Sequence, residues 1–238
     1  MVDLKNIKKS NLWYVVGLIA TDGNLSIDKR HINITSKDRR FLFQVRNSLG
    51  LKNKIGLKTR SDSKDKIYSN FSFGDVNFYK FLLGIGMTPK KSLTMGKISV
   101  EKGHFKDFLR GVVDGDGCIS TWIHKTNLHR QWSLRVTSAA PIFISWLKSE
   151  IENNFQVGGR LHKCEPKNKP NPVYILKFGK MPTHVILKKI YYKNCLSLSR
   201  KHKKSVQCLQ DENKFVNYGQ VLKSPGAVIG SQSGLKIR

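Results

Sequence analysis

The chain repeats one pattern twice, and this repeat limits its possible folds more than any other feature. An apolar run ends in Asp-Gly at "VVGLIATDG" (residues 15–23), and a second run ends in the same way at "LRGVVDGDG" (residues 109–117). In each copy a glycine stands five residues before the aspartate: Gly17 before Asp22, and Gly111 before Asp116. One such ending is common at helix ends and turns. Two copies predict an internal duplication.

The segments that follow the two runs also match in order. "HINITSKDRRFLFQVRNSLGL" and "WSLRVTSAAPIFISWLKSEI" each predict a strand ending in Thr-Ser and then an amphipathic helix. "YSNFSFGDVNFYKFLLGIG" and "VYILKFGKMPTHVILKKI" each predict strand, Phe-Gly and helix. Each half is therefore predicted as helix, hairpin, helix, hairpin, helix, which is an α+β fold. We expect the first half at residues 1–99, the second at 100–215 and a C-terminal tail at 216–238.

Composition predicts the class of partner. The chain has 43 Lys plus Arg against 16 Asp plus Glu, a formal net charge of +27, and a pI of about 10.1. Such a charge is typical of nucleic-acid binders, and 39% hydrophobic residues favour a packed core over a disordered basic tail. The four cysteines show no C-x-x-C spacing, and no apolar run reaches the roughly 20 residues of a membrane span. We expect a soluble, intracellular protein with no membrane partner.

The predicted strands alternate apolar and polar residues, which separates the two faces of each sheet. Trp132, Leu134 and Val136 point to one side, as do Ile32 and Ile34 in the first half. In a further strand the apolar side is formed by Ile67, Phe71 and Phe73. The opposite faces carry Lys, Arg, Asn, Gln and Ser, whose side chains contact phosphates and base edges.

The two aspartates predict a metal site. Gly17 and Thr21 form a small-residue stripe on one helix, and Gly111 and Gly115 form one on the other. Packing through these stripes would bring Asp22 and Asp116 together at two helix C-termini, where negative charge is unfavourable. A divalent cation would offset this cost, and carboxylate and carbonyl oxygens suit Mg²⁺, Mn²⁺ or Ca²⁺. Such metals beside a basic sheet are what phosphodiester hydrolysis requires.

The two segments resemble the paired LAGLIDADG motifs of single-chain homing endonucleases, and the resemblance extends over nearly all of residues 8–210. It implies two pseudo-symmetric αββαββα halves that pack through the motif helices, each with an antiparallel β-saddle facing DNA. The catalytic, metal-binding acid of this family is the eighth motif residue, which corresponds to Asp22 and Asp116. The sixth residue, often also acidic, is Ala20 in the first copy and Asp114 in the second.

The resemblance implies further site residues. Polar residues after the second strand of each half, Ser36 and Ser138, would orient water, and Lys91 and Lys201 would stabilise charge on the phosphate. Lys90, Lys97 and Lys203 compete for this last role. The DNA contacts that we expect on the sheets are Asn33, Thr35, Lys58, Arg60, Lys66, Asn70, Gln131, Ser133, Arg135, Arg160, His162 and Lys177.

The function that this resemblance implies is Mg²⁺-dependent double-strand cleavage of a long pseudo-palindromic DNA target by a monomer, with Mn²⁺ or Ca²⁺ able to substitute in binding. The alternative is a non-cleaving RNA maturase or DNA-binding regulator on the same fold. Retention of both aspartates favours cleavage, and the duplicated core disfavours a ribosomal or chromatin protein. Two short nuclease-like stretches, "HKTNLHR" and "EPK", are predicted to be loops.

Overall fold

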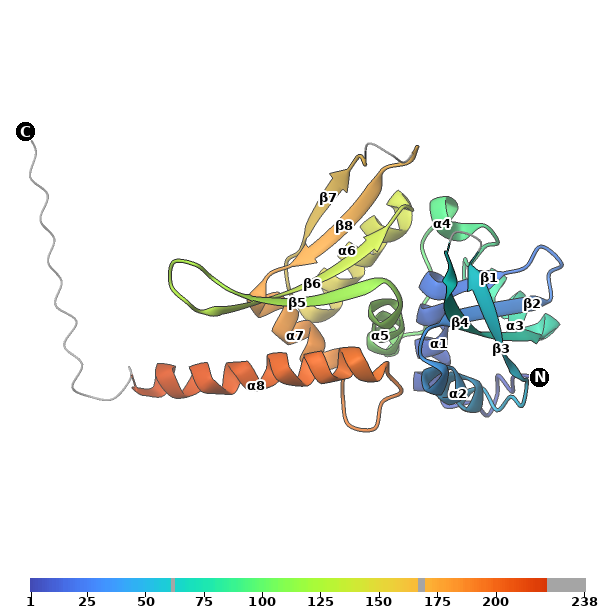
Figure 1. Cartoon of the computed structure of the whole chain (residues 1–238), viewed down its shortest axis with the longest axis horizontal. Helices are drawn as coiled ribbons and strands as arrows, with labels where there is room; N and C mark the ends of the chain where they lie inside the picture. Colours follow the sequence, from blue (N-terminus) through green and yellow to red (C-terminus); the bar gives the residue numbers. More distant parts are fainter. Residues whose placement is uncertain (61–62, 167–169, 222–238) are drawn as a thin grey trace, which may run out of the picture.

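The computed structural model describes residues 1–60, 63–166 and 170–221, with the backbone alone described at 60, 63–66 and 212–221. Each half contains one antiparallel four-stranded sheet and its helices, and α1 and α5 lie side by side in the centre (Figure 1). The elements of the first half are α1 (Lys9–Asp22), β1 (Gly23–Leu25), β2 (His31–Ser36), α2 (Arg39–Ser48), β3 (Ile55–Arg60), β4 (Ser63–Gly74), α3 (Val76–Gly84) and α4 (Lys91–Thr94). Those of the second half are α5 (Phe105–Asp116), β5 (Gly117–Ile123), β6 (Arg130–Ser138), α6 (Pro141–Phe155), β7 (Arg160–Cys164), β8 (Val173–Phe178), α7 (Lys180–Ile190) and α8 (Ser199–Val221).

The two sheets have the same topology, which confirms the predicted duplication. Their strand orders are β1-β2-β4-β3 and β5-β6-β8-β7, and all neighbouring strands are antiparallel. The first residue after each aspartate occupies the same place in both sheets, since Gly23 pairs with Ile34 and Gly117 pairs with Val136. An additional helix, α4 or α8, follows the expected αββαββα order in each half.

The two halves differ in which hairpin is long. In the first half β4 has 12 residues and β1 has only 3. In the second half β5 has 7 residues, and its turn, residues 124–129, contains most of the stretch "HKTNLHR". That stretch is therefore a hairpin turn, as predicted.

One core extends through both halves because α1 is apolar on every side. Its residues from Leu12 to Ala20 are all buried. Helices α2 and α3 instead cover one sheet face, and each begins at an aspartate whose carboxylate accepts a backbone N–H three residues later: Asp38 from Phe41 and Asp75 from Phe78, both at 3.0 Å. The expectation for Ile67 is wrong, since it is 62% exposed although Phe71 and Phe73 are buried. Strand β4 is long enough that Ile67 lies nearer the tip of the β3–β4 hairpin than these two residues do.

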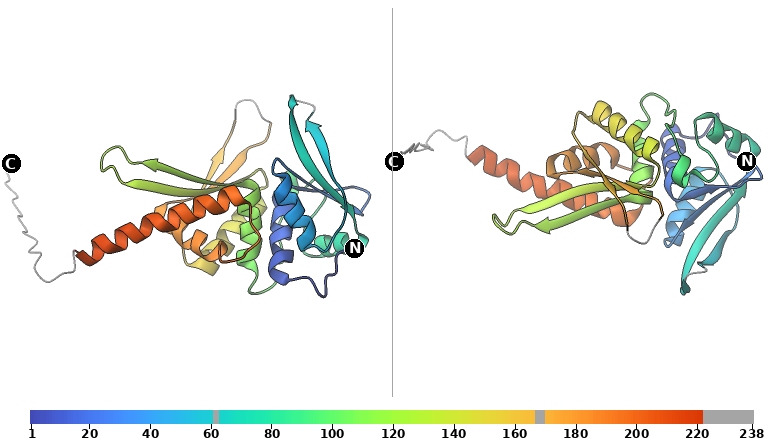
Figure 2. Two further views of the ribbon diagram at one scale, coloured as in Figure 1. Left: turned by 60° about the horizontal axis from the view of Figure 1, so that its bottom comes forward. Right: turned by 90° about the horizontal axis from the view of Figure 1, so that it is seen from above.

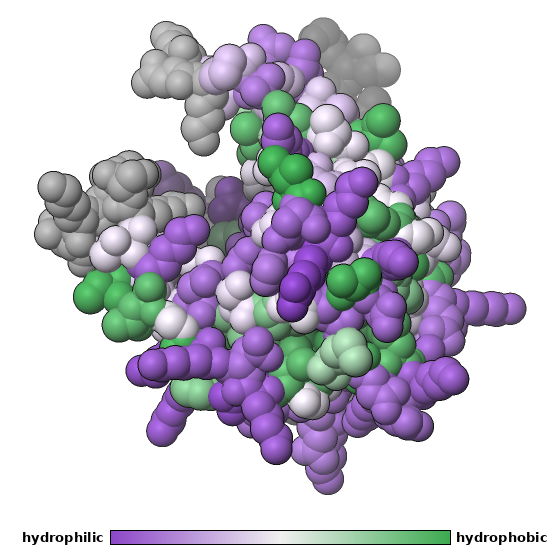
Figure 3. All heavy atoms as spheres, turned by 90° about the vertical axis from the view of Figure 1, so that its right-hand side faces the viewer, coloured by the Kyte–Doolittle hydropathy of each residue, from purple (hydrophilic) through white to green (hydrophobic). Residues whose placement is uncertain are grey.

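Helix α8 extends away from the rest of the molecule (Figure 2). It continues through the predicted tail boundary at 215/216 to Val221, and residues 222–238 of the predicted tail lie outside the described residues. Hydrophilic side chains dominate the side of the molecule formed by the first half (Figure 3). Within the described part of the chain, no helix has both the length and the apolar character to cross a membrane.

Candidate active site

Helices α1 and α5 are in backbone contact at two glycines. A Cβ atom on Gly17 would lie 2.0 Å from the carbonyl oxygen of Phe108, and one on Gly111 would lie 2.0 Å from the carbonyl oxygen of Tyr14. Neither position has room for any side chain. The glycines thus let the two helices cross at the closest possible distance, and their C-terminal ends emerge together.

A third contact brings the two helix ends together. The hydroxyl of Thr21 donates within its own helix to the carbonyl oxygens of Leu18 (3.1 Å) and Gly17 (3.3 Å). A Cβ atom on Gly115 would lie 1.9 Å from that hydroxyl and 3.5 Å from a carboxylate oxygen of Asp22. Asp22 of α1 therefore lies against the last turn of α5.

Asp22 and Asp116 form a coupled carboxylate pair at these helix ends. Solvent reaches both side chains, yet the surrounding protein still removes much of their hydration. Desolvation, followed by the negative charge of Asp116, raises the pKa of Asp22 to about 6. Desolvation also raises the pKa of Asp116. Both shifts show that the negative charge of this pair is unfavourable in the protein alone.

Two buried lysines lie at equivalent places beside the pair. Lys91 (7% exposed) donates through Nζ to the carbonyl oxygens of Gly23 (2.7 Å) and Thr21 (3.4 Å) at the end of α1. Lys201 (4% exposed) donates to those of Val113, Asp114 and Gly115 at the end of α5, at 2.6, 2.7 and 3.0 Å. Each ammonium group thus donates to carbonyl groups at or just after a helix C-terminus, where positive charge is favourable.

The lysines and the aspartates are also coupled electrostatically. Burial lowers the pKa of Lys91 and that of Lys201 to about 8, and both aspartates oppose this shift. Lys90, Lys97 and Lys203, the competing lysines, are exposed. The structure therefore distinguishes the buried Lys91 and Lys201 from their neighbours.

Ser36 and Ser138 have matching local roles. The hydroxyl of Ser36 accepts the backbone N–H of Asp38 at 3.2 Å, and that of Ser138 accepts the N–H of Ala140 at 3.1 Å. Each bond forms a turn that leads into the following helix, α2 or α6. Ser36 also lines a cavity of about 710 Å³ together with Asp22, whereas Ser138 does not line it.

Sequence reasoning missed Arg200, which lines the same cavity as Asp22 and Ser36. It is exposed, it lies at the start of α8, and its positive charge lowers the pKa of Asp22. Arg200 comes from the second half and acts on the aspartate of the first. The only signal in the sequence was its position next to Lys201.

Asp114, the sixth residue of the second motif, is a buried hydrogen-bond acceptor that the motif alone did not explain. It is 1% exposed and accepts from the hydroxyls of Tyr191 (2.6 Å) and Tyr14 (2.7 Å) and from the backbone N–H of Leu198 (2.7 Å). These bonds connect α5 to α1 and to the loop between α7 and α8. Its equivalent in the first half, Ala20, makes no side-chain hydrogen bond.

Nine of the twelve predicted DNA contacts have exposed or half-buried side chains on the sheet faces opposite those that the helices cover. Lys58, Arg135, Arg160, His162 and Lys177 are exposed, and three of them, Arg160, His162 and Lys177, line one cavity of about 630 Å³. Those that are half-buried are Asn33, Thr35, Asn70 and Gln131. The side chains of Arg60 and Lys66 lie outside the described residues.

The expectation for Ser133 is wrong. It is 2% exposed and so does not lie on the open surface. The guanidinium of Arg135 donates to the hydroxyl of Ser120, the residue paired with Ser133, at 3.2 Å. A side chain as long as that of Arg135 can cover a short one, such as that of Ser133, in the middle of a sheet. Trp122, which sequence reasoning missed, is 45% exposed on the same face and pairs with Gln131.

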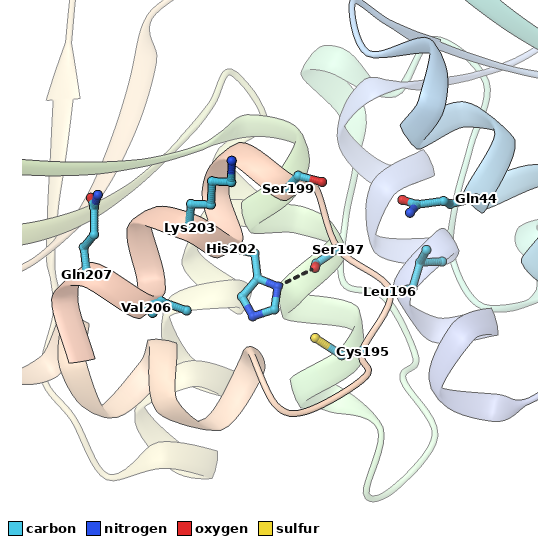
Figure 4. A pocket seen from close by; sticks show the side chains of 9 residues that line it. All are labelled: Gln44, Cys195, Leu196, Ser197, Ser199, His202, Lys203, Val206 and Gln207. Atoms are coloured by element: carbon cyan, nitrogen blue, oxygen red, sulfur yellow. Dashed lines mark hydrogen bonds between the residues drawn. The ribbon is translucent and has the colours of Figure 1, made fainter. Parts of the chain in front are cut away.

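A separate cavity of about 610 Å³ lies beside the first turns of α8 (Figure 4), and neither Asp22 nor Asp116 is among the residues that line it. It contains a Ser-His pair, with Ser197 Oγ and His202 Nδ1 3.3 Å apart. The His202 ring stacks on Tyr191 with 5.6 Å between ring centroids. Packing therefore accounts for this histidine.

Residues 10–86 match the sequence model of the LAGLIDADG-like domain. The chain is similar in structure to the homing endonuclease I-WcaI bound to its DNA recognition sequence, with a TM-score of 0.58 and 12% identity over 84% of this chain and 87% of that one. It is also similar to I-DmoI in complex with DNA and Ca, with a TM-score of 0.50 and 16% identity over 80% of this chain and 93% of that one. Residues 10–86 therefore contain a LAGLIDADG-like domain, and the chain as a whole has the fold of these endonucleases.

A third similar structure is full-length WhiA from Thermatoga maritima, with a TM-score of 0.55 and 14% identity over 90% of this chain. This chain spans 66% of the length of WhiA. No curated protein sequence matches the chain. WhiA is not described as an endonuclease, so the fold by itself does not assign an activity.

Proposed function

We propose that this protein is a site-specific DNA endonuclease that makes a Mg²⁺-dependent double-strand break in a long duplex target. The observation that carries the proposal is the coupled pair of Asp22 and Asp116 at the ends of two helices in backbone contact. The net charge of +27 and two sheets with polar open faces supply a surface for duplex DNA. One chain with two such halves acts as a monomer on a pseudo-palindromic target.

The residues present fit a hard divalent cation. Asp22 and Asp116 would be its protein ligands, because they bring two carboxylates together at the ends of α1 and α5. Among the described residues there is no group of three or more His, Cys, Asp or Glu side chains that could hold a metal ion. Carboxylate oxygens favour Mg²⁺, Mn²⁺ or Ca²⁺ over softer metals, and a bound cation would offset the unfavourable negative charge that the raised pKa values of both aspartates indicate. When bound, the metal would neutralise charge on the phosphate and lower the pKa of a water molecule.

The remaining site residues divide into positioning groups and groups free to meet the phosphate. All three Nζ protons of Lys201 are directed at carbonyl oxygens, and Lys91 directs two of its protons in the same way. These lysines therefore hold the helix ends and supply positive charge at short range. The exposed guanidinium of Arg200 faces the cavity that contains Asp22, where it can donate to a phosphate oxygen.

The test is cleavage of a randomised duplex library in Mg²⁺, comparing wild type with the Asp22→Asn, Asp116→Asn double variant. Asparagine keeps the shape of both side chains but removes the charge that holds the metal, so we expect cleavage to fall at least about 1,000-fold. Binding to the same duplexes should persist, because the sheet faces are unchanged. Lys188→Gln, an exposed residue of α7, is the control and should cut like wild type. Equal cleavage by the double variant and wild type would refute the proposal.

The second candidate is a DNA-binding regulator that does not cut. The fold is compatible with it as well as with cleavage, since WhiA, which is not described as an endonuclease, is similar to this chain over 90% of its length. In that case the wild-type protein would bind selected duplexes in Mg²⁺ and leave both strands intact. The same assay therefore decides between the two functions.

A further inference from the structure

Strand register aligns four residues across the second sheet, immediately after its aspartate. Cys118 pairs with Arg135, Arg135 pairs with Lys177, and Lys177 pairs with Arg160. Three of these four residues are cationic, and we call Arg135, Lys177 and Arg160 the cation row. It lies on the open face of the sheet, since the next residues inward, Leu134 and Leu176, are buried.

The equivalent positions of the first sheet have neutral polar side chains in place of cationic ones. Asn24 pairs with Asn33, and Asn33 pairs with Ser72. Asn24 and Cys118 are both the second residue after a motif aspartate, so the two rows are equivalent in the duplicated fold. We call Asn24, Asn33 and Ser72 the amide row. It is neutral and presents hydrogen-bond donors together with acceptors.

The cation row has no carboxylate to balance it. All three side chains are exposed, and within the described part of the chain none forms an ion pair. Like charges on directly paired strands repel each other. Arg160 and Lys177 also line one cavity of about 630 Å³, beside His162. Apart from the bonds of Arg135 to Ser120 and Cys118, these donors have no acceptor among the described residues, and such a row is suited to a ligand that offers acceptors only.

We propose that the two rows bind the same duplex by different chemistry, an inference that rests on the proposed DNA-binding function. The cation row binds groups that only accept hydrogen bonds, either phosphate oxygens or the O6/N7 edge of guanine, beside Asp116. The amide row binds an adenine edge, which offers one donor and one acceptor, beside Asp22. The two half-sites of the target therefore differ in the chemical groups that the protein contacts, as well as in base sequence.

The experiment measures affinity for a randomised duplex library without divalent metal, at several salt concentrations, followed by sequencing of the bound fraction. One triple variant removes the cation row (R135Q, K177Q, R160Q), and another removes the amide row (N24A, N33A, S72A). The matched control removes three exposed charges that lie off the sheets (K102Q, K188Q, K193Q). Thermal unfolding of each variant checks that it is folded.

We expect the cation-row variant to bind about 10- to 150-fold more weakly than the control variant, the range of one or two good contacts. If the row contacts phosphates, the slope of log K against log salt becomes shallower by about 2 to 3. If it contacts guanine, the slope is nearly unchanged and a guanine preference disappears from one half-site. The amide-row variant should keep the wild-type slope and lose an adenine preference in the other half-site.

The inference is overturned if the cation-row variant behaves like the control variant, or if both row variants lose the same preference and the same slope. Failure of the proposed function gives a different result. If only cleavage fails, the wild-type protein still selects duplexes from the library; if DNA binding itself fails, it shows no selection and the inference falls with it. Because no metal is present, loss of cleavage cannot imitate either outcome.

Discussion

Helices α1 and α5 have equivalent glycines, but their buried side chains are very different. The buried stretch of α1, from Leu12 to Ala20, has no charged side chain. Helix α5 buries Asp107, Arg110 and Asp114, each at most 1% exposed. The duplication has thus preserved the backbone contact between the helices, while their buried side chains differ in polarity.

The buried charges of α5 hold one particular loop. Arg110 donates to Asp107 and to the carbonyl oxygens of Ile190 and Leu196, each at 2.9 Å, and its side chain lies over the ring of Tyr192. Together with the bonds of Asp114, these contacts connect α5 to the segment that joins α7 to α8. That segment leads to Arg200 and Lys201.

The site therefore has two parts, one that both halves share and one that only the second half supplies. The paired aspartates, glycines and lysines follow the pseudo-symmetry. The glycines and lysines contact main-chain atoms in both halves, and the aspartates are the last residues of α1 and α5. The loop before α8 is held by side chains that only the second half has. We therefore expect changes to the first part to affect both halves equally, and changes to the second part to affect one.

The largest effect should come from adding a methyl group at Gly17 or Gly111, the two glycines of the seam where the backbones of α1 and α5 are in contact. Gly17→Ala and Gly111→Ala each place Cβ 2.0 Å from a carbonyl oxygen of the facing backbone, so the helices must separate. We expect each variant to lose about 4 kcal/mol or more of unfolding free energy, or not to fold, and the two losses to be similar. Chemical denaturation measures the loss.

Gly84→Ala is the matched control, because a Cβ there meets nothing within 4 Å in the described structure. It should be neutral or slightly stabilising, as alanine is the better helix former. If only one of the two seam glycines proved intolerant, the seam would not be symmetric.

The next effect concerns the side chains that only the second half has. Asp114→Ala removes three hydrogen bonds and leaves the buried hydroxyls of Tyr14 and Tyr191 without their acceptor. We expect a loss of about 2–4 kcal/mol, against about 1 kcal/mol for Tyr191→Phe, which removes only one bond. Urea denaturation of both variants provides the measurement.

The reciprocal change, Ala20→Asp, places a carboxylate in the buried and otherwise apolar stretch of α1 and should also destabilise the protein. An unchanged stability for Asp114→Ala would mean that the loop before α8 does not depend on this network.

The smallest effect concerns pH and tests the carboxylate pair itself. Because the folded-state pKa of Asp22 is about 6 and its ordinary value is 3.8, the folded protein binds the proton more tightly than the unfolded chain. This contribution is fully present below pH 3.8 and is lost as pH rises through 6. Asp22→Asn, which does not titrate, should therefore be more stable than wild type by about 1 kcal/mol at pH 8, after allowing for solvent screening, and equally stable near pH 3.5.

Denaturation in EDTA at several pH values measures this difference. Asp116→Asn should change stability in the same direction, since its pKa is raised as well. A difference that stayed constant between pH 3.5 and 8 would contradict the raised pKa of Asp22.

Much of the fold could be predicted because the relevant signals are local. Period-2 alternation around Trp132 and Leu134 identifies β6 and its buried face, and the amphipathic run after Ser36 identifies α2. The same local rule failed at Ile67 and Ser133, since burial depends on what lies above a strand as well as on its alternation. Alternation along a strand predicts which side chains share a face of the sheet. The packing of other elements and side chains on that face decides which of them are buried.

The duplication, the helix-end aspartates and the glycine pairs could be predicted from the sequence, because each appears as a repeated spacing along the chain. Tertiary structure alone decided that Lys91 and Lys201 are the buried lysines, that Arg200 faces Asp22, and that Asp114 holds the loop before α8. These outcomes depend on the path of the loops that follow α3 and α7. Loop paths result from many weak contacts between distant residues, so no short stretch of sequence records them.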